Sequence, residues 1–194
     1  MSDNFKEYEF NNQKRKLKEL NAIDTSKEDL KEIQLAIDEI LNTLSQEELL
    51  SIREQNKKNR EIIENLIGKD NAFPLKAIEK LLPFIKKLTE EIANGKANKR
   101  TINIHSYACD YMATLSRDTS LIPTGTSVPS SAKEDFELSE LESMNKEEIL
   151  KKWNRLFTDC IEEIESGLSE HDNIKICADC QRAWQLSNIS SIFL

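Results

Sequence analysis

Three short stretches of the sequence carry the signature of a helix start, and they constrain the fold more than any other feature. Ser26, Ser45 and Asn145 are each followed, three residues later, by Asp or Glu. In such a capping box the first side chain accepts a hydrogen bond from a free backbone N–H, while the acid reaches back to the cap residue. The sequence therefore predicts helices that begin at these three positions.

The spacing of apolar residues extends the helical pattern along most of the chain. Between residues 30 and 44, Leu and Ile recur every three or four positions, which places them on one stripe of a helix. Similar spacing recurs in the segments 75–92, 104–115, 149–164 and 174–184. We also expect helices over 4–21 and 49–66, but residues 55–60 are entirely polar, so that part either projects into solvent or interrupts the helix. Gly68, Gly95 and Gly167 follow three of these segments, where glycine commonly ends a helix. Pro83 lies inside one of them and predicts a kink.

Glycine and proline are scarce, which decides the fold class. Each occurs only four times, too few for the frequent turns of a β-sandwich or barrel. We therefore expect an all-α protein, a bundle of about six to seven helices with a long Ser/Thr/Pro-rich loop before the last two. That loop, residues 117–135, is the predicted boundary between an N-terminal helical block, 1–116, and an acidic C-terminal helical block, 136–194. We expect the two blocks to pack together as one domain.

The negative charge is concentrated in the second half of the chain. Residues 1–100 carry 19 Lys and Arg and 19 Asp and Glu, whereas residues 101–194 carry 8 and 16. An acidic surface repels phosphate groups, so the sequence predicts neither a nucleic-acid partner nor binding to an anionic membrane. The sequence contains no apolar run of membrane-spanning length and no signal-peptide pattern at residues 1–10. We therefore expect a cytoplasmic protein, although non-classical secretion would leave no such signature.

The sequence contains four cysteines, which are candidates for metal or redox chemistry: Cys109, Cys160, Cys177 and Cys180. Cys177 and Cys180 form a CxxC motif, a spacing found in zinc and redox sites. A structural zinc site needs four ligands. His105 and Cys109 lie four residues apart, share one helix face and are the candidates for the other two ligands. Cys160 and His171 are further options.

Other interpretations of the same residues are open. Cys177 and Cys180 also fit a helix core as small apolar residues, close to Trp184, and we favour this interpretation over zinc. Cys109 with His105 or His171 would form a Cys–His nucleophile, a weaker hypothesis because no signature supplies an orienting acid. Trp153 and Phe157, which share the apolar stripe of the segment 149–164, are expected in the core, as is Trp184.

The predicted function follows mainly from the classes of protein function that the sequence disfavours. It contains neither a GxGxxG motif nor a phosphate-binding GxxxxGK[ST] loop. We predict a protein–protein interaction module, such as an adaptor, a regulatory subunit or an effector, with no evident catalytic machinery and no cofactor. One alternative is an acidic inhibitor or immunity-type protein that covers a basic partner. Another is an enzyme or zinc-binding protein with a cryptic site around Cys177 and Cys180.

Overall fold

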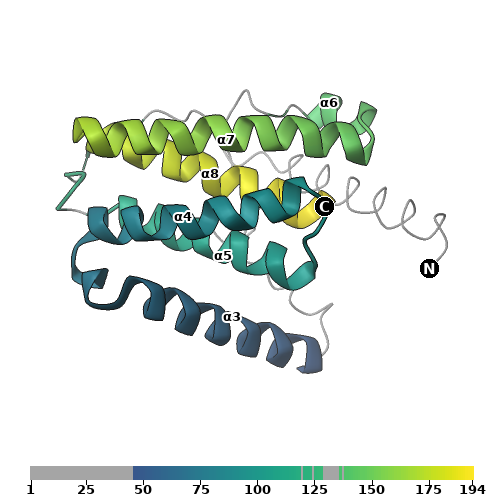
Figure 1. The fold of residues 1–194 in the computed structure, drawn as a ribbon, viewed down its shortest axis with the longest axis horizontal. Coiled ribbons are helices and arrows are strands. Elements are labelled where there is room, and N and C mark those ends of the chain that lie inside the picture. The colour runs from purple at the N-terminus through teal and green to yellow at the C-terminus, as the bar shows by residue number, and fades with distance from the viewer. Residues whose placement is uncertain (1–45, 119, 124, 129–135, 137) are drawn as a thin grey trace, which may run out of the picture. The chain divides into compact units, whose positions relative to one another are not determined.

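Every element of the described structure is a helix. The computed structural model describes residues 46–118, 120–123, 125–128, 136 and 138–194 (Figure 1). The elements in chain order are α3 (Gln46–Ile67), the 3-10 helix η1 (Gly68–Ala72), α4 (Pro74–Ala93), α5 (Lys99–Ser116), α6 (Leu138–Ser143), α7 (Lys146–Glu170) and α8 (Asn173–Phe193). The described ranges contain no strand, so the all-α prediction is confirmed. The helix starts predicted at Ser26 and Ser45 lie outside these ranges, and the count of six to seven helices stays a prediction.

The chain divides into two compact units, residues 1–60 and residues 61–194. The second unit contains a ring of four long helices in the spatial order α4, α5, α8 and α7 (Figure 1). Residues of both predicted blocks contribute to its core, on either side of the predicted loop at 117–135. The boundary predicted at that loop stays a prediction. No helix in the described part of the chain is long and apolar enough to cross a membrane.

Each helix of the ring runs antiparallel to both of its neighbours. The side chain of Gln181 on α8 donates to the carbonyl of Ala113 on α5, at 2.9 Å. Nearer the start of α8, Asn173 donates to the carbonyl of Leu121, which follows α5, at 3.3 Å. Residue numbers therefore fall along α8 in the direction in which they rise along α5, so these two helices are antiparallel. Consequently α4 and α8 run one way and α5 and α7 the other (Figure 1).

This arrangement explains the long segment between α5 and α7. The two helices are diagonal in the ring and run in the same direction, so the chain must return along the length of the bundle before α7 begins (Figure 1). The short helix α6 interrupts this crossover connection, and the sequence analysis did not predict it. On α7, Lys152 holds α6 through an ion pair with Glu140, at 2.5 Å.

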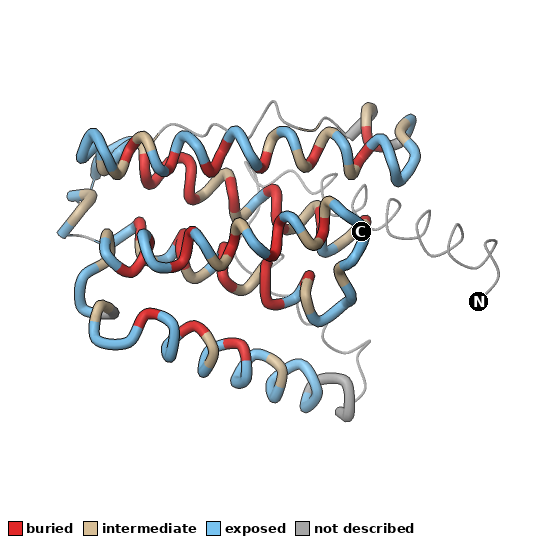
Figure 2. The backbone as a smooth tube through the Cα atoms, viewed as in Figure 1, coloured by how far each residue is buried: buried red, intermediate tan, exposed pale blue. Residues whose placement is uncertain are grey.

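The core lies where the apolar stripes of the four helices meet, and its members are buried along their inward faces (Figure 2). The apolar stripe predicted for the segment 75–92 lies on α4, and its inward-facing residues between Ala77 and Ile92 are buried. Pro83 lies on the exposed side of α4, which continues through it. On α8, the five consecutive residues from Ile176 to Cys180 are all buried. Five successive residues cannot share one face of a helix, so α8 is enclosed all round at this level.

The two ends of α7 show one correct and one wrong helix-boundary prediction. Asn145 caps the start as predicted: its side chain accepts from the backbone N–H of Glu148, whose carboxylate accepts from the N–H of Asn145. Gly167 was predicted to end the helix, but α7 continues to Glu170 and ends at His171, in the left-handed conformation with φ 59°. Gly167 is instead needed for packing, because a Cβ there would lie 2.9 Å from Ile176 Cγ1 on α8.

The last helix is longer than predicted. Asp172 caps its start through the backbone N–H groups of Ile174 and Lys175. The segment after residue 188, for which no helix was predicted, continues α8 to Phe193, which is buried.

Candidate functional site

The predicted metal ligands lie on two helices of the ring. Cys177 and Cys180 are on α8, and His105 and Cys109 are on α5, one helical turn apart. All four side chains are buried. Among the described residues, however, no three His, Cys, Asp or Glu side chains are gathered so that they could hold a metal ion. Zinc binding at these residues therefore stays a prediction, without a structural observation in its favour.

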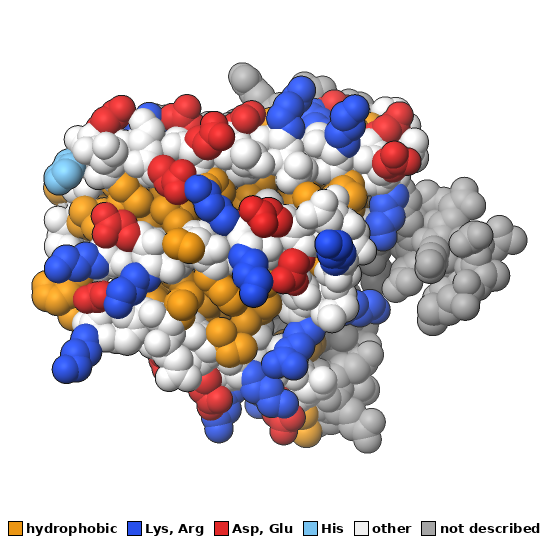
Figure 3. Space-filling model, viewed as in Figure 1, with side chains coloured by type: hydrophobic (Ala, Val, Ile, Leu, Met, Phe, Trp, Pro, Cys, Tyr) orange, Lys and Arg blue, Asp and Glu red, His pale blue; other side chains and the backbone are white. Residues whose placement is uncertain are grey.

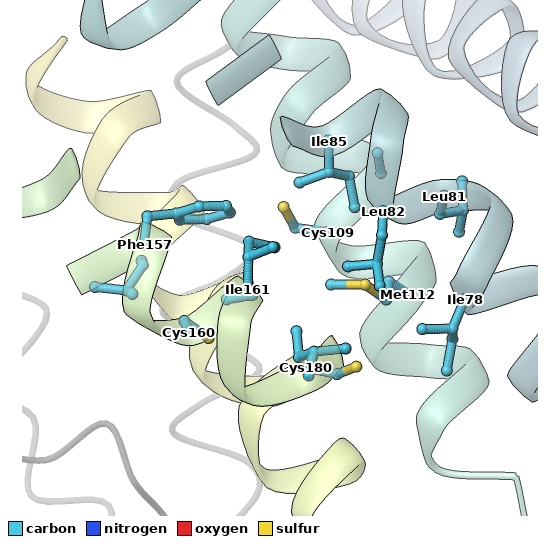
Figure 4. Close-up of a cluster of buried hydrophobic side chains, with 14 of the residues drawn as sticks. Ile78, Leu81, Leu82, Ile85, Cys109, Met112, Phe157, Cys160, Ile161 and Cys180 are labelled. Atoms are coloured by element: carbon cyan, nitrogen blue, oxygen red, sulfur yellow. The ribbon is translucent and has the colours of Figure 1, made fainter. Parts of the chain in front are cut away.

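The thiols lie in the apolar interior between the helices. Figure 4 shows Cys109 from α5, Cys160 from α7 and Cys180 from α8 among Leu, Ile and Phe side chains of the core. The thiol of Cys160 donates to the backbone carbonyl of Asp179, at 3.0 Å. Burial raises the pKa of the Cys109 and Cys180 thiols well above the usual range. Both are therefore held as neutral thiols, the form that is a poor nucleophile and a poor metal ligand.

The two histidines lie in different surroundings. His171 is exposed at the end of α7, where its Nδ1 lies 3.2 Å from the carbonyl oxygen of Ser169. His105 is fully buried, and its Nε2 lies 3.0 Å from Thr89 Oγ1 on α4. Within the part of the chain that the structure describes, neither histidine is hydrogen-bonded to Cys109, and the nucleophile stays a hypothesis.

The hydrogen bonds around His105 determine its tautomer. The Thr89 hydroxyl donates its one proton to the carbonyl of Ile85, at 2.8 Å. The contact between Thr89 and His105 therefore requires that Nε2 carry the proton and donate. The other ring nitrogen, Nδ1, is buried and has no hydrogen-bond partner among the described residues. Burial lowers the pKa of His105 to about 3, so the imidazole is neutral at physiological pH.

Two aromatic side chains of α7 enclose this imidazole. Its ring centroid lies 5.8 Å from that of Trp153, in an edge-on arrangement, and 4.8 Å from that of Phe157. Both are fully buried, as the sequence predicts. Thr89 was not predicted as the hydrogen-bond partner of His105. The available signal was a threonine on the apolar face of α4, where its hydroxyl can bond the carbonyl four residues earlier.

The second half of α7 carries a dense group of carboxylates on the surface. We call it the acidic face; its members are Asp159, Glu162, Glu163, Glu165 and Glu170, all exposed. No Lys or Arg occurs in the sequence between residues 156 and 174. Figure 3 shows acidic side chains along α7 and basic ones toward the start of that helix. The acidic face carries five of the sixteen Asp and Glu residues between positions 101 and 194, so it holds part of the acidity predicted for the C-terminal half.

A few large apolar side chains are exposed on the same unit. Phe73, just before α4, is 57% exposed, and Lys76 lies 5.3 Å above its ring. Leu66 and Ile174 are also exposed, whereas Trp184, expected in the core, is only half-buried. Isolated exposed apolar residues are common on soluble proteins and do not define a binding surface by themselves.

Comparison with protein-family models, with curated proteins and with solved structures gives no match for this chain.

Proposed function

We propose that the protein works by binding another protein, and that this partner presents a Lys- and Arg-rich surface to the acidic face of α7. The observation that carries the proposal is that five of the twelve residues from Asp159 to Glu170 are carboxylates, all exposed. Opposite charges on two surfaces steer their encounter and select against other partners.

Helix stability does not account for this density of carboxylates. Asp159 lies three residues before Glu162 and four before Glu163, and like charges at these spacings destabilise a helix. Glu170 lies in the last turn, where the negative end of the helix dipole disfavours another negative charge. The acidic face therefore opposes helix formation, which supports a role outside the stability of α7.

Neighbouring lysines neutralise only part of the face. Lys175 on α8 lies 2.8 Å from Glu163 and 3.9 Å from Glu170. Its hydrogen bond lowers the pKa of Glu163. Lys86 on α4 lies 2.6 Å from Glu165.

Asp159 and Glu162 are left without an ion pair to any Lys or Arg that the structure describes. These two carboxylates are the members that we expect to contact a basic partner first.

The charge of the face also selects the class of partner. Nucleic acids and anionic membranes carry phosphate groups, which these carboxylates repel. A basic protein is the class that the face attracts. The proposal covers both an adaptor that recruits such a protein and an inhibitor that covers its basic site, and it keeps the cytoplasmic, non-catalytic role predicted from the sequence.

The test is capture from the native source by the immobilised full chain, with two variants of equal net charge. In the first, Asp159→Lys and Glu162→Lys remove the uncompensated part of the acidic face. In the control, Glu79→Lys and Glu90→Lys change exposed carboxylates of α4 by the same charge. We expect the wild type and the control to retain the same protein, and the acidic-face variant to lose it.

Two further results are needed, and either can contradict the proposal. The captured protein should be released as the salt concentration rises, because screening weakens attraction between exposed charges. It should also bear a basic surface patch. Retention by the acidic-face variant, or binding that salt does not weaken, would show that another surface carries the interaction. Circular dichroism of all three proteins verifies that each variant is folded.

A further inference from the structure

His105 lies at the meeting point of three helices, in a setting that accepts only its neutral form. It is carried by α5, donates to Thr89 on α4, and is enclosed by Trp153 and Phe157 of α7. Its side chain is fully buried. The only available position for a second proton is Nδ1, which has no hydrogen-bond acceptor among the described residues. Protonation would therefore create a buried cation with one unsatisfied N–H group.

No neighbouring charge offsets that cost. The buried titratable groups on the surrounding helices are Cys109 on α5, Cys160 on α7, and Cys177, Asp179 and Cys180 on α8. The charged pair Lys86–Glu165 joins α4 and α7 at the surface. None of them shifts the pKa of His105, for which burial is the one cause. Aromatic faces attract cations, but this attraction is smaller than the cost of removing a charge from water. The imidazolium form therefore needs contact with water.

His105 lies where α4 meets α7, along a line that we call the α4/α7 seam. Of the four contacts in the helix ring, that between α4 and α7 is the smallest. Apolar side chains come to the surface along it (Figure 3). On the outside it is bridged by Lys86 and Glu165, whose side chains are 44% and 46% exposed. Exposed ion pairs of this kind add little stability, so this bridge contributes little to keeping the seam closed.

We propose that acid opens the helix bundle along the α4/α7 seam, with His105 as the group that takes up the proton. The opened unit would present the apolar faces of α4 and α7, which are buried at neutral pH. The opening requires no bound partner, although Glu165 of the bridging ion pair is also a member of the acidic face.

The direction of the pH dependence follows from the two states of the imidazole. In the closed bundle the pKa of His105 is about 3, and in water it is 6.5. Between these values the open state binds a proton that the closed state does not. The free energy that favours the closed bundle is therefore greatest above pH 6.5 and decreases as the pH falls from 6.5 toward 3. From pH 7 to pH 5 the opening equilibrium constant should rise on the order of 20-fold.

The chain has only two histidines, so a matched control is available. Hydrogen–deuterium exchange of the full chain would be measured at pH 7 and pH 5 for the wild type, His105→Gln and His171→Gln, corrected for intrinsic exchange rates. The side-chain amide introduced by His105→Gln keeps a donor for Thr89 but does not titrate. We expect the protection of α4 and α7 amides to fall on the order of 20-fold in the wild type and in His171→Gln. In His105→Gln it should change little.

Several outcomes would overturn the proposal. One is the same pH-dependent loss of protection in His105→Gln as in the wild type. Another is equal loss in all four helices of the ring, which would indicate global unfolding without a preferred seam. If His105→Gln does not fold, nitrogen-15 NMR of the wild-type imidazoles keeps the idea testable. A His105 ring that becomes protonated at pH 5 while the bundle stays closed would refute it.

Discussion

Gly167 gives the sharpest test of the packing between α7 and α8, because two physical effects predict opposite signs for Gly167→Ala. In an exposed helix interior, replacing Gly by Ala stabilises the helix by about 1 kcal/mol. Here the new methyl group would lie 2.9 Å from Ile176 Cγ1 and 3.4 Å from the backbone nitrogen of Ile176. Ile176 is 1% exposed and held within the core, so it cannot move aside freely.

Overpacking of this kind costs ~1–3 kcal/mol, more than the gain in helix propensity. We therefore expect Gly167→Ala to lower the free energy of unfolding by about 1 kcal/mol. Urea titration followed by circular dichroism would measure it. Ser169→Ala, an exposed change on the same helix, is the control and should be neutral or slightly stabilising.

A double-mutant cycle isolates the contact. Ile176→Ala removes Cγ1 and by itself costs about 2–5 kcal/mol. In that background Gly167→Ala no longer meets the ethyl group, so it should become stabilising by about 1 kcal/mol. If Gly167→Ala also stabilises the protein by about 1 kcal/mol when Ile176 is present, α7 and α8 do not approach as closely at Gly167 as the structure shows.

Two other predictions concern the helix start at Asn145 and the buried thiols. Asn145→Ala removes the cap of α7 and should lower the free energy of unfolding by about 1 kcal/mol, as measured by urea titration. Asn145→Asp keeps a capping oxygen and should retain most of the wild-type stability. Equal stability of the two variants would contradict the role of Asn145 as a cap. All four thiols are buried, so in native protein a disulfide reagent should react only as fast as the structure opens, and with all four after denaturation. A thiol that reacts at the rate of free cysteine must lie at the surface, which would contradict its burial in the core.

Sequence reasoning was most successful where a feature is local. The start of α7 at Asn145 depends on residues within one turn, and the buried stripe of α4 depends on spacing within one helix. Both are encoded in short windows of sequence. The same local reasoning failed at Gly167, where glycine resembles a helix end. Its real role depends on Ile176, which belongs to the next helix.

The candidate functional residues show the same division. The excess of acid in the second half was readable from composition, but the exposure of five of these carboxylates on α7 needed the register of that helix. His105 was identified as a residue of interest, yet as a metal ligand beside Cys109. Its hydrogen bond to Thr89 joins residues 16 apart on different helices, which no spacing within one helix reveals.

The crossover between α5 and α7 has a consequence for engineering the chain. Because α4 with α5 and α7 with α8 each form an antiparallel hairpin, each hairpin closes over a short connection. The crossover only has to span the distance between them. Lengthening such a connection costs little, about 0.6 kcal/mol for each doubling of its length. A reporter peptide inserted beside exposed Gly125 should therefore leave the bundle intact.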